Sequence, residues 1–471
     1  MSRCSTAAAN DDGQPRPGPG RAGPGRAGPA ARALLAGLAL AAALLAPAAP
    51  AGAAEAAPVT LRYMLWDASQ RPLYQQCADD FQRQNPAIRI RIQQQGWDDY
   101  WTTLSTGLVA ETAPDVFTNH LSKYPDLVAN HQLVDLAPYI RQDGLDPAGY
   151  EPGLYAPWGR DGHQYGLPKD WDTVALVVNL DHARAQGVTE AELRDMRWNP
   201  RDGGSFGQVV ARLTRDAAGR HGLQAGFDKT RVQVVGYQNP GPGGMAGQTE
   251  WAPFAASNGF SHQARPWDAA LRFDDPRLAD TLTWLAALPA RGWSLAPQAV
   301  GKLGVETLFI TGRAAMVPAG AWMVGHYARQ VRFGYAWVPL PIGPEGHRSS
   351  MLNGLADSIW IGTRHPQAAW AWVRHLASTD CQRKLAAAGA VFPARAGLSE
   401  LTLAAFRQRG VDASVFVQMA RGRTFAPPIV ENAAEIDQII GAAIENILLG
   451  RAEAGPALRA ANARALAVAR P

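Results

Sequence analysis

Carboxylates in this sequence stand beside tryptophans at points where β-prone runs begin or end. Trp66-Asp67 follows one such run, and Asp170-Trp171-Asp172 precedes another. Carboxylates accept hydrogen bonds from hydroxyl groups, and flat aromatic rings pack on apolar faces. Because a sugar ring has hydroxyls at its rim and C–H groups on its faces, this pairing suits a polyhydroxylated ligand held away from water.

A further candidate follows the stretch 310–322. A turn at Thr311-Gly312 leads into the short apolar run 314–317, which Pro318 and Gly320 end. We interpret the run as a parallel strand buried in a sheet. The loop after such a strand faces the crevice where open α/β sheets bind ligands, so Trp322 is expected to contact a ligand. The alternative is that Trp322 covers the core.

The surrounding pattern predicts alternating strands and helices. Runs at 59–66, 88–92 and 115–117 favour strands, and the segments 72–84 and 100–110 between them favour helices. This alternation is typical of parallel sheets with right-handed crossovers. The unbroken run 173–178 predicts a strand buried on both faces that passes from one lobe into the next. Residues 433–468 favour helix, with a break expected at Gly455-Pro456.

The N-terminal 53 residues are expected to be a low-complexity leader and a signal peptide. A 14-residue apolar run at 33–46 follows arginines and precedes Ala51-Gly52-Ala53, which matches a cleavage pattern. The cleavage pattern has no cysteine near it that would suggest a lipid anchor. We therefore expect a free periplasmic or extracellular protein. Of the three cysteines, Cys77 and Cys381 remain in the mature chain, where they form either a disulfide or two buried thiols.

The charge of the chain argues against nucleic acid as a partner. The net charge is +4, and five arginines against two aspartates in residues 1–53 account for most of it. Phosphate recognition needs clustered Lys and Arg, which a nearly neutral mature chain lacks. The ten histidines show no metal-binding spacing, so neither a metal nor a cofactor is expected.

Several weak motifs in fixed order are similar to a known family. They are Phe81 with Asn85-Pro86, Ala113-Pro114-Asp115-Val116-Phe117, Tyr165-Gly166-Leu167-Pro168, Gly312-Arg313-Ala314-Ala315-Met316 with Gly320 and Trp322, Pro339 with Pro341 and Gly343, Ala368-Ala369-Trp370, and Phe392-Pro393-Ala394. Together they resemble the extracellular solute-binding proteins of carbohydrate ABC importers, the group that includes maltose-binding protein. The resemblance covers nearly all of residues 59–471.

This resemblance implies an α/β fold of two lobes, the type II periplasmic-binding-protein fold. Each lobe would be a mostly parallel sheet flanked by helices, and hinge strands would join the lobes. Lobe one would comprise 58–169 and 355–393, and lobe two 173–350 and 397–471. The hinges would lie near 168–172, 351–355 and 392–396. A sugar would bind in the cleft of a monomer, which would deliver it to a membrane permease.

In the family, a carboxylate at the position of Asp172 and an aromatic ring at that of Trp322 contact the sugar. The other candidate ligand-binding residues are Trp66, Asp67, Asp170, Asn119, Glu111, Trp251, Trp267, Asn353, Gly354 and Arg395. Each has a structural alternative: a carboxylate can cap a helix or hold a hinge, a tryptophan can belong to the core, and Glu111 can be solvated. His120 is expected to be a surface residue.

Two other functions remain open. A secreted glycoside hydrolase would use a pair such as Asp170 and Asp172 as acid and base, but glycosidases place these groups on opposite sides of the scissile bond, whereas this pair lies on one strand. A binding protein for a polyol phosphate or another small solute would share the same fold. The number of acidic candidates and the 15 tryptophans favour a neutral mono- or oligosaccharide.

Overall fold

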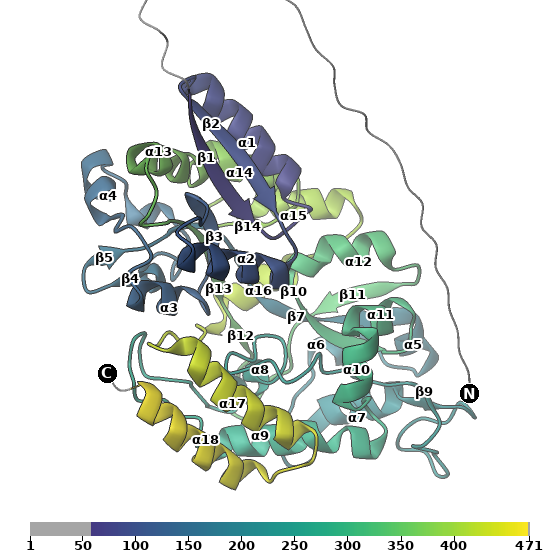
Figure 1. The fold of residues 1–471 in the computed structure, drawn as a ribbon. Coiled ribbons are helices and arrows are strands. Elements are labelled where there is room, and N and C mark those ends of the chain that lie inside the picture. The colour runs from purple at the N-terminus through teal and green to yellow at the C-terminus, as the bar shows by residue number, and fades with distance from the viewer. Residues whose placement is uncertain (1–57, 470–471) are drawn as a thin grey trace, which may run out of the picture. The chain divides into compact units, whose positions relative to one another are not determined.

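The computed structural model describes residues 58–469. The expected leader and signal peptide therefore lie outside the described residues. The described chain begins with alternating elements, β1 (Val59–Leu65), α1 (Arg71–Gln84), β2 (Ile88–Gln94), α2 (Trp97–Val109) and β3 (Val116–His120) (Figure 1). Pro72 stands in the first turn of α1, where its missing N–H costs nothing, and Asn85 before Pro86 ends the helix.

The largest sheet has six strands in the order β14-β6-β13-β3-β1-β2. It is completed by β6 (Leu167–Asp172), β13 (Asn353–Ile359) and β14 (Phe392–Pro393). Strands β1, β2 and β3 pair in parallel, but β13 runs antiparallel to both neighbours and β14 antiparallel to β6. The expectation of a mostly parallel sheet is therefore wrong for this sheet, which is mixed.

The direction of β13 follows from the path of the chain. The chain leaves this sheet at Asp172 and passes directly into β7 (Val174–Asn179). It returns at Asn353, which pairs with Asp172 in the ladder. Because the chain re-enters at the end where it left, β13 must run back along β6.

The second sheet has three strands in the order β10-β7-β11, with β10 (Met316–Gly320) and β11 (Tyr335–Val338). Every residue of β7 is buried, as the run 173–178 predicts. The strand expected within 310–322 exists and is buried, but it pairs antiparallel with β7. Both pairings in this sheet are antiparallel, so the prediction of a parallel strand was wrong.

Short two-stranded ladders complete the strands: β12 (Ser349–Met351) with β15 (Arg423–Phe425), β4 (Gly159–Arg160) with β5 (His163–Gln164), and β8 (Arg215–Asp216) with β9 (Val232–Val234). The remaining α-helices are α3 (Tyr124–Ala129), α4 (Ala137–Asp143), α5 (Leu180–Ala185), α6 (Glu190–Arg194), α7 (Gly204–Leu213), α8 (Ala252–Ser257), α9 (Pro276–Ala287), α10 (Pro297–Leu303), α11 (Val305–Ile310), α12 (Val324–Gln330), α13 (Pro366–Leu376), α14 (Thr379–Ala387), α15 (Ser399–Gln408), α16 (Ser414–Arg421), α17 (Ala433–Leu448) and α18 (Ala454–Ala469).

The C-terminal helical segment breaks earlier than expected. Helix α17 ends at Leu448, and Gly450 adopts a left-handed conformation with φ 68°. Gly455 and Pro456 instead lie in the first turn of α18, where proline is tolerated. The turn residue that ends α17 is thus Gly450.

The hydrophobic core follows the two larger sheets. Side chains that alternate along β1 divide between two clusters: Leu61 and Tyr63 pack with α1 and α13, and Met64 packs with Tyr100 of α2. A third and larger cluster surrounds β7 and β10 and includes residues of α17 and α18. Cys77 of α1 and Cys381 of α14 form a disulfide with a Cα–Cα distance of 5.5 Å, which settles the alternative left open by the sequence.

Candidate functional site

A series of hydrogen-bonded polar side chains lies where β6 ends and β13 begins. The Asn353 amide donates to Asp172 Oδ2 at 3.3 Å and contacts His120 Nε2 at 3.0 Å. Gln248, from the loop before α8, donates to Asp172 Oδ1 at 2.7 Å. Segments far apart in the sequence therefore converge on one carboxylate at a strand end, which is where α/β sheets bind ligands.

The second carboxylate of β6 is buried and incompletely paired. Asp170 is 3 % exposed, and its Oδ2 atom has no hydrogen-bond partner within residues 58–469. Burial raises the pKa of Asp170 to about 7. Burial, and then the neighbouring charge of Asp170, raise the pKa of Asp172 well above its ordinary value. A carboxyl that is neutral near pH 7 can donate as well as accept, which suits hydroxyl recognition.

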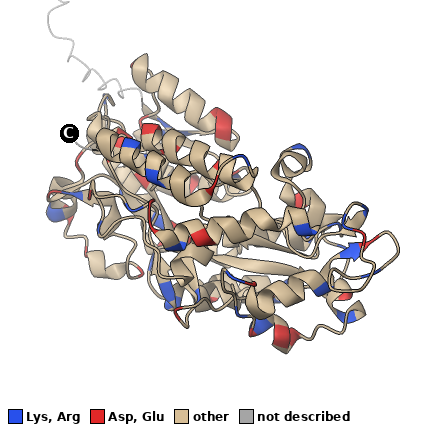
Figure 2. Cartoon of the chain, turned by 90° about the horizontal axis from the view of Figure 1, so that it is seen from below, with Lys and Arg blue, Asp and Glu red and all other residues tan. Residues whose placement is uncertain are grey.

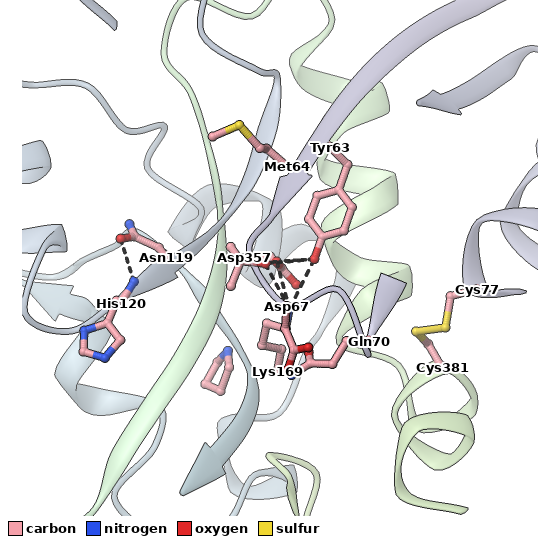
Figure 3. A network of polar contacts seen from close by, with 12 residues as sticks. Tyr63, Met64, Asp67, Gln70, Cys77, Asn119, His120, Lys169, Asp357 and Cys381 are labelled. Carbon is pink, nitrogen blue, oxygen red and sulfur yellow. Dashed lines mark hydrogen bonds and ion pairs between the residues drawn. A yellow bond between two sulfur atoms is a disulfide. The ribbon is translucent and has the colours of Figure 1, made fainter. Parts of the chain in front are cut away.

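Lys169 holds this part of β6 in place (Figure 3). Its buried ammonium group donates to Thr118 Oγ1 at 2.9 Å and to the Tyr63 hydroxyl at 3.3 Å, and it lies 3.9 Å from Asp357 Oδ1. The register of β6 against β13 shifts at this residue, which is a β-bulge. Bulges redirect neighbouring side chains, so Lys169 and its partners fix how Asp170 leaves the strand.

Trp322 lines a small cavity together with these carboxylates. It stands just after β10 and is 45 % exposed. Its ring covers Gly320 so closely that a Cβ atom at Gly320 would collide with it. Trp322, Asp170 and Asp172 line one cavity of about 40 Å³ together with Gln70, Trp171, Ala321, Leu355, Ala390, Val391, Phe392 and Phe406.

Aromatic rings cluster at the end of β1. The Trp66 ring lies 5.0 Å from that of Trp97 and 5.1 Å from that of Tyr100, both edge-on. His120 joins the cluster, with its ring 5.4 Å from Trp97. Trp97 is 42 % exposed, so this cluster presents an aromatic surface. The surface lies next to the polar side chains around Asp172, because His120 belongs to both groups.

Three other predicted residues have structural roles in this neighbourhood. Asp67 accepts hydrogen bonds from Ser69 and from the Gln70 amide, so it positions a residue that lines the cavity. Asn119 is fully buried and donates to Ser358 at 3.1 Å. Gly354 is buried within β13, and a Cβ atom at this position would contact Leu154.

Among the predicted residues, only Asp170, Asp172 and Trp322 line the cavity. The remaining four have contacts elsewhere. Trp251 is fully buried in the large core cluster. The Trp267 ring has the Arg160 guanidinium 4.4 Å above it. Arg395 lies 4.4 Å above the Tyr150 ring and donates to the Ala377 carbonyl. Glu111 is exposed, with a left-handed backbone of φ 55°.

The sequence reasoning missed His120, Gln248 and Trp97. His120 was expected on the surface, but it is partly buried and bonded to Asn353, and burial lowers its pKa to about 3. Its position at the end of β3 was a usable signal. Gln248 follows the glycine-rich loop 239–247, which carries no periodic pattern, so nothing local indicated its contact with Asp172.

Two sheets with polar and aromatic groups where the chain crosses between them are typical of a solute-binding fold. Residues 76–407 match the model of the bacterial extracellular solute-binding protein family, and the chain belongs to that family. UspC of Mycobacterium tuberculosis is 26 % identical, with a TM-score of 0.69, over 87 % of this chain and all of that protein.

Two other solved structures share the fold at lower identity. The ABC substrate-binding protein Lmo0181 of Listeria monocytogenes, in complex with cycloalternan, has a TM-score of 0.71 at 19 % identity, covering 87 % of this chain and 98 % of its own. The GacH receptor of Streptomyces glaucescens has a TM-score of 0.70 at 16 % identity, covering 88 % and 98 %. The two-lobed fold is thereby confirmed. None of the helices within residues 58–469 has the length and apolarity needed to cross a bilayer.

Proposed function

We propose that this protein is the substrate-binding component of an ABC importer and captures a mono- or oligosaccharide. The observation that carries the proposal is the meeting of Asp170, Asp172 and Trp322 in one cavity at the crossing between the sheets. Solved relatives in complex with cycloalternan, acarbose or maltose support the ligand class. The carboxylates would bind hydroxyls, and the Trp322 face would pack on a sugar ring.

Sugar entry requires the cavity to open. A volume of about 40 Å³ is far below the roughly 300 Å³ of a small ligand pocket. We infer that the six-stranded sheet belongs to lobe one and the three-stranded sheet to lobe two, with hinges near 168–172, 351–355 and 392–396. Rotation about these strands would separate Gln248 from Asp172 and expose the carboxylates.

A neutral sugar fits this cavity better than a polyol phosphate. Among the described residues that line the cavity there is no lysine or arginine, while two carboxylates face it. Phosphate recognition favours arginine forks, and the lining of this cavity provides none. The same two carboxylates lie two positions apart on one strand, an arrangement that does not place an acid and a base on opposite sides of a glycosidic bond.

The proposal includes export and a membrane partner. The leader 1–53 would direct the chain across the membrane without a lipid anchor, and the closed, sugar-loaded monomer would dock on the permease subunits. No step in this function breaks a covalent bond.

Thermal unfolding of residues 54–471 against a panel of mono-, di- and trisaccharides tests the proposal. A ligand that binds only the native state stabilises it by about 4 kcal/mol at a thousandfold excess over Kd. We expect one sugar class to raise Tm and to be recovered unchanged by chromatography. Recovery of a cleaved sugar would establish an enzyme, and a shift with glycerol 3-phosphate alone would overturn the ligand class.

A further inference from the structure

A second and larger cavity has a different lining from the candidate sugar site. It has a volume of about 770 Å³ and is bordered by α15, α16, β15 and the residues directly before β12. None of its lining residues belongs to the cavity that contains Trp322. A volume of this size falls within the range of small-molecule pockets.

Four arginines line this cavity: Arg348, Arg407, Arg421 and Arg423. The one acidic side chain among the described lining residues is Glu400, whose carboxylate lies 3.7 Å from Arg407. Within residues 58–469, the other three arginines have no carboxylate within 4 Å. The cavity thus has an excess of three guanidinium groups, although basic and acidic residues are interspersed over the molecule as a whole (Figure 2).

The strand pairing holds two of these arginines near each other. Ser349, the first residue of β12, pairs with Arg423, the first residue of β15. Arg348 directly precedes β12, so Arg348 and Arg423 lie at the same end of one ladder. Arg421 is the last residue of α16, two positions before Arg423. A rigid strand pair and a helix end therefore present the three groups.

Arg348 makes no ion pair among the described residues, although the charge of Asp195 acts on it from farther away. It is partly buried, and its Nε atom is buried with no hydrogen-bond partner among the described residues. Its terminal nitrogen donates to the Arg194 carbonyl, which is a neutral acceptor. Burial lowers the pKa of Arg348, since desolvation disfavours the charged form. An anion beside it would supply both the missing acceptor and the opposite charge.

We propose that this cavity is a binding site for a small multivalent anion, such as a phosphorylated metabolite. Arg348, Arg421 and Arg423 would bind the anionic oxygens through their planar N–H groups. Ser414 and Gln418, which also line the cavity, would bind the neutral part of the molecule. The proposal does not depend on the sugar-binding function, because the two cavities share no lining residue.

Calorimetric titration with inorganic pyrophosphate at low salt tests this site in residues 54–471. We expect saturable binding to one site that weakens as NaCl is added. The double variant R348Q/R423Q should weaken binding by about tenfold or more, since a hydrogen bond to a charged group contributes about 1.5–3 kcal/mol and 1.4 kcal/mol is tenfold. R421Q, at an exposed position, should weaken binding without affecting folding.

The matched control is R332Q, which removes an exposed arginine outside the cavity and should leave binding unchanged. Thermal unfolding of each variant separates lost binding from lost structure. The proposal is overturned if wild-type protein shows no saturable binding at millimolar pyrophosphate. It is also overturned if R348Q/R423Q or R421Q, correctly folded, binds as the wild type does, or if the effect appears in W322A instead.

Discussion

At the scale of single residues, a substitution at Trp322 distinguishes a role in sugar binding from a role in stability. Its ring is 45 % exposed, so its removal deletes a ligand-facing surface while most of the core packing stays in place. We expect Trp322→Ala to weaken sugar binding by a few kcal/mol with little change in Tm. Calorimetry and thermal unfolding measure the two effects.

The matched control for this variant is Trp372→Ala. Trp372 is fully buried in the cluster beneath the six-stranded sheet, and its loss should cost about 3–5 kcal/mol of unfolding free energy. If Trp322→Ala instead lowers stability as much as it lowers affinity, Trp322 is a core residue.

Asp170 makes stability depend on pH. Its folded pKa of about 7 lies above the ordinary 3.8, so the native state binds the proton more tightly than the unfolded chain. Below about pH 4 the carboxyl is protonated in both states, and its contribution to the free energy of unfolding is fully present. As pH rises towards 7 the unfolded chain loses this proton before the native state does, so the free energy of unfolding falls. At roughly 1.4 kcal/mol per pKa unit, the loss is about 4 kcal/mol over that window.

Asp170→Asn removes this titration and keeps the size of the side chain. The unfolding free energy of the variant, minus that of the wild type, should rise between pH 4 and pH 7 and then level off. Denaturant unfolding at several pH values measures the difference, and a difference that is flat with pH would show that Asp170 is ionised throughout.

At the scale of elements, the disulfide joins α1 to α14. The two cysteines are 304 residues apart in sequence, so the bridge restricts the unfolded chain strongly. We expect Cys77→Ser/Cys381→Ser to lose about 3 kcal/mol of unfolding free energy and to bind sugar with unchanged affinity, because neither cysteine lines the candidate site. Reductant should lower the Tm of the wild type and leave that of the variant unchanged. A variant as stable as the wild type would mean that the bridge contributes nothing.

The sequence predicted the elements well where a local pattern specified them. Pro72 and Asn85-Pro86 set the limits of α1, and the apolar run 173–178 predicted β7. Strand direction was predicted wrongly for β10, because direction depends on where a distant segment returns to the sheet. Asp172 and Trp322 line one cavity, and their contact with a sugar stays a prediction. His120 and Gln248 were missed because their contacts join segments whose proximity no local pattern encodes.

At the scale of the whole molecule, contacts between the two expected lobes would favour the closed form of the protein. Arg160 pairs with Glu431 and lies over Trp267, and Asp126 accepts from the backbone of Ala434 at the start of α17. If hinge opening breaks these contacts, Arg160→Gln should shift the population towards open forms and raise the Kd for sugar several-fold. Small-angle scattering without and with sugar should show a larger change in the variant.

Arg83→Gln is the control, because Arg83 pairs only with Asp80 on the same helix among the described residues. An Arg160→Gln variant with the wild-type Kd and scattering change would show that these contacts do not oppose opening.

The order of the strands also determines when the first sheet can form during synthesis. Strand β3 pairs with β1 on one side and with β13 on the other, and β13 begins 233 positions after His120, the end of β3. A ribosome must therefore produce more than two thirds of the chain before β3 gains its second neighbour. Until then β3 is an unpaired edge, a template for contact with other nascent chains. The architecture that surrounds the candidate site with distant segments thus leaves an open strand edge in the half-synthesised protein.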